Sequence, residues 1–490
     1  MSMLGRAVKN TLALSATELF SKAINFVFIA VLVRHLTPGD FGGYTTVMTL
    51  VAFMVPLADM GISQVLVREI AVNRSRSRSL LFNALTVTLG MSGLAWVAMV
   101  MVALRANYPD ALRPLIVLAG LSMMGNTLML TTGSVFRGYE RMEVLGGLTS
   151  ALLLVSSLVG IGVALAGQGV AVQIGISIVS ALIGVVIMLA VIHRQFVALQ
   201  WALDARLCWS LARQALPVMV LVFFTVMLRW MDVLILGQLR SMSDVATYSA
   251  SIKIIDVAEV ISLSAGAALF PVLSISWRES SEATQKLYSQ SLRFFVAFGL
   301  AVAVAISVMA DSLVVTTFGA AYASVATPLR LLGWAFFFTT INGPVGALVI
   351  AAGDRYRKYV PLIGLIVLGN VALNLFFAPH WGAVGSAGAY VVTGVATFVL
   401  RQAIAADYFA HPPRLGPLLW RPAVAALAMG ITLWLSRPLS VFVSIPLGGV
   451  IFIGMLGLLG ELKQEPYCAL LTLATPVALR KYLGWSTKTS

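Results

Sequence analysis

The sequence predicts an all-α, polytopic membrane protein with about fourteen transmembrane helices. Hydrophobic residues make up 59% of the 490 residues, charged residues only 11%, and the mean hydropathy is +0.95. A soluble domain has about 25% charged residues, so this composition excludes one. Runs of roughly 20 apolar residues, the length that crosses a hydrocarbon core of about 30 Å, recur along the whole chain.

Fourteen apolar segments follow one another along the sequence. The first is too long, and begins too late, for an ordinary cleaved signal peptide, so we expect it to remain as a membrane helix. The last two are short and flank Arg437-Pro438, which leaves twelve segments as the fallback count. The predicted segments are residues 11–34, 42–66, 80–104, 112–136, 144–166, 170–192, 214–237, 245–270, 291–317, 325–351, 359–378, 383–405, 420–436 and 440–460.

Eight charged residues stand out inside the apolar segments, and all of them fall on segments one, two, seven and eight. A charge that faces lipid near the bilayer centre costs at least about 2.5–3.5 kcal/mol, so such residues normally face a water-filled cavity or pair with one another. We therefore predict that these four segments line one polar pathway. The residues are Glu18 and Lys22, then Asp59, then Arg229 and Asp232, then Lys253, Asp256 and Glu259.

The spacing of these residues leaves two interpretations open. Ser249, Lys253, Asp256 and Glu259 fall within an arc of roughly 120° on a helix, which gives segment eight one polar stripe. The pairs Glu18/Lys22 and Arg229/Asp232 are spaced i,i+4 and i,i+3, so each pair could form a local ion pair that only tethers its helix. Segment eight fits that second interpretation less well, because a single Lys253 does not neutralise two carboxylates.

Positive residues predict the orientation of the segments. With the N-terminus in the cytoplasm, 24 of the 33 Lys and Arg residues fall on the cytoplasmic side. Cytoplasmic loops collect such residues, so both termini are predicted to be cytoplasmic. The bias accounts for the net charge of +14 without nucleic-acid binding. A basic inner surface also favours contact with anionic membrane lipids.

We predict no enzymatic activity, cofactor or metal site. The loops between segments are too short to fold as catalytic domains, and the Gly-x4-Gly-Lys-Ser/Thr phosphate loop is missing from the sequence. The four histidines lie in separate loops without metal-ligand spacing. Cys208 and Cys468 are interpreted as ordinary thiols rather than a disulfide framework.

Weak internal matches predict two related halves. Asp40-Phe-Gly-Gly-Tyr44 enters segment two, and Asp244-Val-Ala-Thr-Tyr248 enters segment eight. Together with two further matches, the common offset is 204 to 216 residues, which indicates a parallel duplication of six helices. The predicted division is an N-terminal six-helix lobe at 1–200, a C-terminal six-helix lobe at 201–410, two additional transmembrane helices at 411–465 and a cytoplasmic tail at 466–490. The tail either lies on the inner membrane surface or is frayed.

Several motifs resemble bacterial polysaccharide and O-antigen flippases, which transport lipid-linked oligosaccharides. They are Leu36-Thr37-Pro38-Gly39-Asp40-Phe41-Gly42-Gly43-Tyr44, Leu57-Ala58-Asp59-Met60-Gly61, Arg68-Glu69-Ile70-Ala71, Asp244 to Glu259, Phe318-Gly319 with Tyr322, Gly353-Asp354-Arg355, and Asn370 to Asn374 followed by Trp381-Gly382-Ala383-Val384-Gly385. The resemblance covers nearly the whole chain. It extends to the wider superfamily of lipid II flippases and multidrug-and-toxin extruders.

The resemblance implies two six-helix lobes around a central cavity lined by helices one, two, seven and eight. The substrate would be an oligosaccharide on a polyprenyl diphosphate, moved from the inner to the outer leaflet of the bacterial cytoplasmic membrane by alternating access. Lys22, Arg229 and Lys253 would contact the diphosphate, since cations bind phosphate strongly in a low-dielectric site. Polysaccharide polymerases and glycosyltransferases are the implied partners.

The carboxylates keep other functions open. The predicted buried set holds three cations and five carboxylates, a net charge of minus two if all are ionised. Glu18, Asp59, Asp232, Asp256 and Glu259 are therefore also candidates for ion coupling, with Asp256 or Glu259 favoured as carriers of a proton. An acidic cavity suits an ion-coupled multidrug or cation extruder, and a non-transporting scaffold of a polysaccharide assembly complex is a third possibility.

Overall fold

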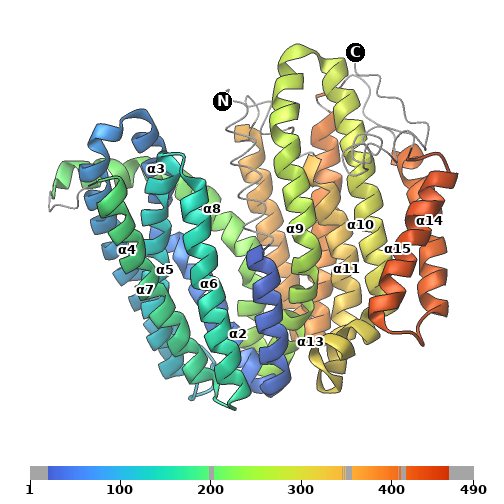
Figure 1. Cartoon of the computed structure of the whole chain (residues 1–490), viewed down its shortest axis with the longest axis horizontal. Coiled ribbons are helices and arrows are strands. Elements are labelled where there is room, and N and C mark those ends of the chain that lie inside the picture. The colour runs from blue at the N-terminus through green and yellow to red at the C-terminus, as the bar shows by residue number, and fades with distance from the viewer. Residues whose placement is uncertain are drawn as a thin grey trace. The chain divides into compact units, whose positions relative to one another are not determined.

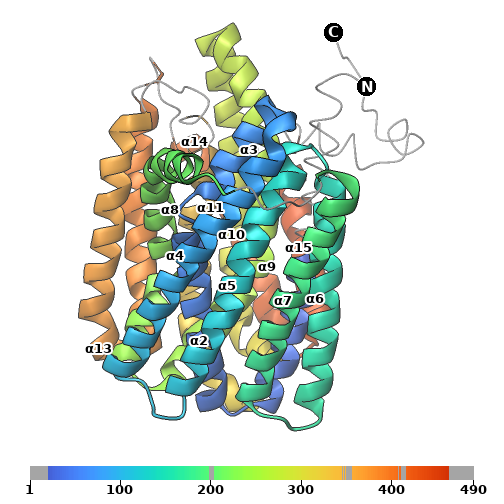
Figure 2. The same cartoon turned by 90° about the vertical axis from the view of Figure 1, so that its left-hand side faces the viewer.

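The computed structural model describes residues 20–197, 203–344, 346, 348, 356–406, 408–409 and 415–462. All regular elements within these ranges are helical (Figures 1 and 2). They are a first helix at 20–35, then α2 Pro38–Asp59, α3 Ile62–Val72, η1 Arg74–Arg76, α4 Ser77–Arg105, α5 Arg113–Gly138, α6 Met142–Leu165, α7 Val170–Gln195, α8 Ala205–Leu239, α9 Met242–Glu279, α10 Ser281–Phe318, η2 Ala320–Val325, α11 Ala326–Ile341, α13 Tyr356–Ala406, α14 Leu415–Leu435 and α15 Val441–Leu458.

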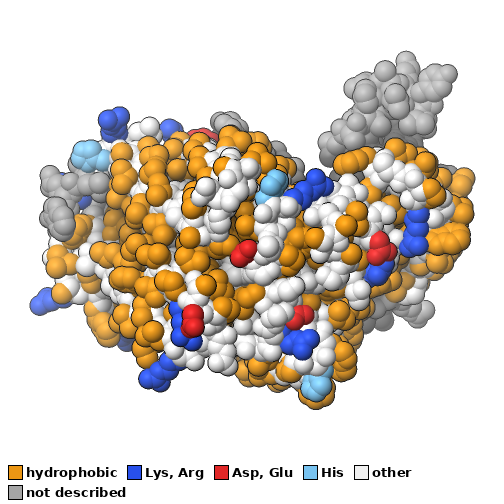
Figure 3. Space-filling view, turned by 90° about the horizontal axis from the view of Figure 1, so that it is seen from below, with side chains coloured by type: hydrophobic (Ala, Val, Ile, Leu, Met, Phe, Trp, Pro, Cys, Tyr) orange, Lys and Arg blue, Asp and Glu red, His pale blue; other side chains and the backbone are white. Residues whose placement is uncertain are grey.

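The predicted class, an all-α polytopic membrane protein, is confirmed. Eleven helices in the described residues are long and apolar enough to cross a membrane. Three further segments bring the total to the predicted fourteen: the helix at 20–35, the charged α9, and the second half of α13, which breaks at Gly382 (φ +54). Hydrophobic side chains cover much of the face shown in Figure 3, and the charged side chains on it are scattered, several of them as neighbouring acidic and basic groups.

The chain folds into two compact units. Unit 1 comprises residues 1–260, 317–328 and 357–393, and unit 2 comprises 261–316, 329–356 and 394–490. Within unit 1, α4 packs on α5, α5 on α7 and α6 on α7, so these helices run side by side (Figure 2). The division into lobes near residues 200 and 410 stays a prediction, and the predicted tail at 466–490 lies outside the described residues.

The duplicated motif at Asp40 and Asp244 is a repeated helix start. The Thr37 hydroxyl oxygen accepts a hydrogen bond from the Asp40 backbone N–H (3.2 Å) and donates one to the Asp40 carboxylate (2.7 Å). At the start of α9, Ser241 makes the same two bonds with Asp244, at 3.2 and 2.9 Å. Side-chain caps of this kind satisfy backbone donors that the first helical turn leaves unpaired.

Predicted segment two is not one continuous helix. The sequence predicts a span over 42–66, but α2 ends at Asp59 and α3 begins at Ile62. Met60 (φ 53) and Gly61 (φ 81) lie between them in the left-handed region, which does not continue a right-handed helix. The Leu57 to Gly61 motif is therefore a helix break, and the apolar composition of the segment conceals it.

The glycines of the Leu36 to Tyr44 motif allow close packing inside unit 1. A Cβ atom on Gly42 would lie 1.7 Å from the backbone oxygen of Met242, at the start of α9. This oxygen belongs to the backbone and does not move aside as a flexible side chain would. Gly42 therefore lets the starts of α2 and α9 touch.

We expect Gly42→Ala to destabilise the protein by about 1–3 kcal/mol, the usual cost of overpacking a tight contact. The matched control is Gly90→Ala on α4, where nothing lies within 4 Å of the added methyl group. That change should be neutral or stabilise by up to about 1 kcal/mol, because alanine favours helix more than glycine does. Thermal unfolding of the purified protein in detergent measures both effects. Equal midpoints for Gly42→Ala and Gly90→Ala would contradict the packing argument.

Candidate functional site

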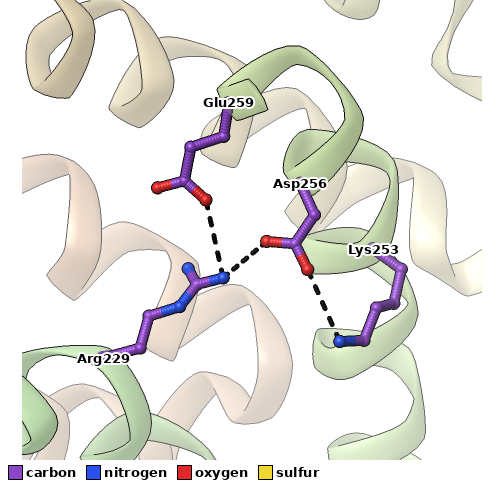
Figure 4. Close-up of polar contacts among 4 residues, drawn as sticks. All are labelled: Arg229, Lys253, Asp256 and Glu259. Atoms are coloured by element: carbon purple, nitrogen blue, oxygen red, sulfur yellow. Dashed lines mark hydrogen bonds and ion pairs between the residues drawn. The ribbon is translucent and has the colours of Figure 1, made fainter. Parts of the chain in front are cut away.

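Four charged side chains on α8 and α9 form one cluster in unit 1 (Figure 4). The Arg229 guanidinium lies 2.5 Å from a carboxylate oxygen of Asp256 and 3.5 Å from one of Glu259. The Lys253 ammonium lies 3.4 Å from the other oxygen of Asp256. Asp256 therefore contacts two cations, and its side chain is only 9% exposed.

The helical repeat explains why these residues meet. Lys253, Asp256 and Glu259 are spaced by three residues, so they lie on one face of α9, as the predicted polar stripe requires. Arg229 reaches this face from α8. Because a buried carboxylate is costly without a partner, the two cations stabilise Asp256 in its charged form.

Lys22, on the helix at 20–35, belongs to the same electrostatic group. Its ammonium interacts with both Lys253 and Asp256, and the Tyr390 hydroxyl on α13 interacts with Arg229, Asp256 and Glu259. Asp232 interacts electrostatically with Arg229 and Tyr390 in the same way, so three cations face three carboxylates among the described residues and the group has no net formal charge.

A cavity of about 160 Å³ opens beside Lys253. Its walls come from the helix at 20–35, α2, α8 and α9, the four predicted segments one, two, seven and eight. All lining residues belong to unit 1. The four segments therefore meet at this cavity, and a polar pathway through them stays a prediction. The lining residues are Asn25, Ile29, Tyr44, Thr45, Met48, Thr49, Trp230, Val233, Ser249, Ile252 and Lys253.

Asp232 does not pair with Arg229, although the i,i+3 spacing allowed that pair. Its carboxylate accepts a hydrogen bond from the Tyr248 hydroxyl (2.8 Å) and one from the Asn374 side-chain amide (2.8 Å). The residue is only 3% exposed. Arg229 turns instead to Asp256 and Glu259 on the neighbouring helix, where two carboxylates are in reach.

Asp59 forms a separate polar cluster at the α2–α3 break. Its carboxylate accepts hydrogen bonds from the backbone N–H of Ser63 (3.3 Å) and from the Ser63 hydroxyl (2.7 Å). The Thr131 hydroxyl lies 3.4 Å away on α5, and Arg137 interacts with Asp59 electrostatically. Asp59 thus stabilises the start of α3, as acidic residues do at helix N-termini. Glu18, the remaining predicted carboxylate, lies outside the described residues.

Among the described residues, the predicted carboxylates do not all bond to the predicted cations. The predicted net charge of minus two placed all five carboxylates with the three cations, but Asp59 and Asp232 bind neutral or distant partners elsewhere in unit 1.

Sequence reasoning also missed the roles of Tyr248, Tyr390 and Asn374. Asn370 and Asn374, four residues apart in an apolar segment, carried a usable signal, because amides inside membrane helices usually bond to other polar groups.

Comparisons with known proteins agree with this architecture. The family described as "Polysaccharide biosynthesis protein" matches residues 7–277. The structure of the lipid II flippase MurJ in an inward closed conformation has a TM-score of 0.76 at 10% identity, covering 93% of this chain and 99% of that one. No curated protein matches the sequence.

Transporters of the multidrug resistance MATE group share the fold at lower similarity. An inward-facing MATE family transporter of the MOP superfamily has a TM-score of 0.61 at 15% identity, covering 79% of this chain and 95% of that one. A MOP superfamily transporter from Pyrococcus furiosus, described as having a binding pocket of reverse polarity, has a TM-score of 0.53 at 14% identity, covering 82% and 96%.

Proposed function

The chain belongs to the polysaccharide biosynthesis protein family, and we propose that it flips a polyprenyl-diphosphate-linked oligosaccharide across the membrane. The direction is from the inner to the outer leaflet of the bacterial cytoplasmic membrane, by alternating access. The MurJ- and MATE-like fold is that of a transporter and not of an enzyme. Glycosyltransferases would supply the substrate, and a polysaccharide polymerase would consume it.

The observation that carries this proposal is a pair of cations held at the cavity. Lys253 lines the cavity, and Asp256 links it to Arg229, which also contacts Glu259. A diphosphate offers oxygen acceptors that match the donors of a guanidinium, and charge-assisted hydrogen bonds to phosphate are strong where water is scarce.

Ion-pair exchange gives a physical route for binding and release. Without substrate, Asp256 and Glu259 neutralise Arg229, which avoids an unpaired buried cation. A bound diphosphate would share Arg229 and Lys253 with these carboxylates, so that the buried Asp256 keeps a partner. When the substrate leaves, the carboxylates alone neutralise the cations again, so neither state leaves a buried charge unpaired.

An extruder of cationic drugs is the alternative within the same fold. Such a substrate requires a cavity in which carboxylates outnumber cations, since a buried cation needs an opposite charge. In the described cluster Asp256 and Glu259 already contact Arg229 and Lys253, so neither carboxylate is left for a cationic drug, which favours an anionic substrate. A non-transporting scaffold, the third possibility, requires none of these charges for polysaccharide export.

We expect Arg229→Gln and Lys253→Gln each to lower polysaccharide export on the order of ten- to a hundredfold, because each removes a charge-assisted hydrogen bond of about 1.5–3 kcal/mol. Arg229→Lys, which keeps the charge but not the planar fork, should fall between wild type and Arg229→Gln. The measurement is surface polysaccharide in a flippase-deficient cell, at matched levels of monodisperse protein. Arg330→Gln, which breaks the exposed pair with Asp311, serves as the control and should export normally.

Full export by both Gln variants would rule out these residues as substrate contacts and would favour the scaffold. Loss of export in Arg330→Gln as well would mean that the assay responds to protein damage rather than to charge at the cavity.

We also propose that a buried carboxylate couples transport to an ion gradient. The sequence favours Asp256 and Glu259 as candidates, but both contact Arg229. Asp232 accepts its hydrogen bonds from the neutral side chains of Tyr248 and Asn374. A buried carboxylate with neutral partners gains most from taking up a proton or a sodium ion, so Asp232 is the stronger candidate.

In reconstituted vesicles, an imposed proton or sodium gradient should accelerate transport by the wild-type protein. The transport rate of Asp232→Asn should be the same with and without the gradient. Asn keeps the size of Asp and can still bond to Tyr248, so the fold should persist. Asp59→Asn, a change at another buried carboxylate, is the control and should keep the gradient response. Wild-type transport that is indifferent to both ions would contradict any coupling role.

The orientation of the chain is tested with single cysteines. Cys208→Ser and Cys468→Ser remove the two native thiols, so that only the introduced cysteine can react. Cys208 itself would report poorly on exposure, because burial and the nearby Asp204 carboxylate raise the pKa of its thiol. The target side chains at Ser75, Asp110, Ser241 and Ser281 are all exposed.

An impermeant thiol reagent added to intact cells should label cysteines at positions 110 and 241 and leave those at 75 and 281 unlabelled. After the cells are permeabilised, all four should react. External labelling at 75 or 281 would reverse the proposed orientation, and with it the inner-to-outer direction of transport.

A further inference from the structure

A second cavity, of about 300 Å³, lies inside unit 1 among the helix at 20–35, α2, α5, α6 and α7. This volume is at the lower end of the roughly 300–1,000 Å³ of small-molecule sites. The side chains that line it are hydroxyls, amides and apolar groups, and no charged residue is among the described lining residues. Its chemistry therefore differs from that of the Lys253 cavity.

The polar groups of this cavity do not mainly serve to join helices. The hydroxyls of Thr149, Ser156 and Ser177 donate to carbonyl oxygens of their own helices, at 2.9, 3.0 and 2.7 Å. The Asn126 amide likewise donates to Ser122 one turn earlier, at 2.8 Å. Polar residues that hold membrane helices together bond across the interface instead, as Gln173 does to the Gly160 carbonyl.

These local bonds decide which hydrogen bonds are left for a ligand. Each of these three hydroxyls has used its single donor and keeps lone pairs, and the Asn126 amide keeps its carbonyl oxygen. A ligand in this cavity is therefore met by several acceptors. It satisfies them best if it carries many O–H donors and no charge, because an unpaired charge is costly to bury. A neutral sugar has this chemistry.

The two cavities adjoin each other. Asn25, Tyr44 and Met48 line both of them, so one wall separates the uncharged cavity from the space beside Lys253. We propose that the 300 Å³ cavity is a binding subsite for an uncharged sugar unit of the substrate whose diphosphate meets Lys253. This inference rests on the proposed function, and it assigns recognition of the sugar to α5, α6 and α7.

The first experiment measures protection of a cysteine at Ser177, in the full chain carrying Cys208→Ser and Cys468→Ser. Purified protein in detergent is treated with a small water-soluble thiol reagent in the presence of glucose, galactose, mannose, N-acetylglucosamine, glucuronate or inorganic diphosphate. At about ten times its Kd, a neutral sugar that fits should slow labelling about tenfold. Glucuronate and diphosphate should not slow it.

Three results would each overturn the subsite. Labelling that none of the neutral sugars slows would mean that the cavity holds only water, and no labelling would mean that the cavity is closed. Protection by glucuronate equal to that by neutral sugars would contradict the argument from charge. Ser75→Cys, at the exposed short helix η1 in the same background, is the control and should be labelled at one rate in every solution.

The second experiment fills the cavity. Ser177→Leu places a larger apolar side chain in it, whereas Val179→Leu, two residues along α7, points to an outer apolar groove and is 55% exposed. In a flippase-deficient cell, Ser177→Leu should reduce export at least about tenfold and Val179→Leu should not, with thermal unfolding confirming that both proteins fold. Tenfold corresponds to about 1.4 kcal/mol of lost binding.

The outcomes separate the two proposals. If wild type fails to restore export, the flippase function itself is wrong. If wild type and Ser177→Leu restore export equally, the flippase stands and the sugar subsite is wrong. Should Ser177→Leu prove unstable, Ser177→Ala keeps the space and removes one acceptor, so unchanged sugar protection in Ser156→Cys carrying Ser177→Ala would also overturn the subsite.

Discussion

A charged side chain inside a membrane needs an opposite charge or water, and the contact between Arg229 and Asp256 satisfies this requirement at the cavity. It joins α8 to α9, and Lys253 and Glu259 extend it along one face of α9. Removing one member of such a network leaves its partner uncompensated, which typically costs about 3–5 kcal/mol. The cluster therefore stabilises the packing of two helices and also keeps cations beside the cavity.

Unit 2 meets the same requirement in a different way. Glu461, which is fully buried, contacts Arg293 on α10 at 3.0 Å and Arg421 on α14 at 3.1 Å. One carboxylate thus joins two helices to the residues that follow α15. The pair of Arg330 and Asp311 is exposed and contributes at most about 1 kcal/mol. Burial, rather than the number of ion pairs, decides which of these contacts hold the helices together.

The helices could be predicted from the sequence because an apolar run is a local property that fixes both length and class. Partners could not be predicted in the same way. Asp232 bonds to Asn374, 142 residues away, and Arg229 pairs with Asp256 rather than with Asp232, which is nearer in the sequence. The charges were counted correctly, but their grouping depends on tertiary contacts. The α2–α3 break was missed because Met60 and Gly61 interrupt the backbone without interrupting the apolar composition.

Met60 adopts a left-handed conformation without being glycine, which costs a non-glycine residue of order 1 kcal/mol or more. The Asp59 carboxylate offsets this strain through its bonds to Ser63 on α3. The direct covalent link between α2 and α3 therefore consists of Met60 and Gly61, and the Asp59–Ser63 bonds span it. The joint divides one apolar segment between two surroundings: α2 lines both cavities, whereas α3 packs in an apolar cluster with Leu80 and Phe136.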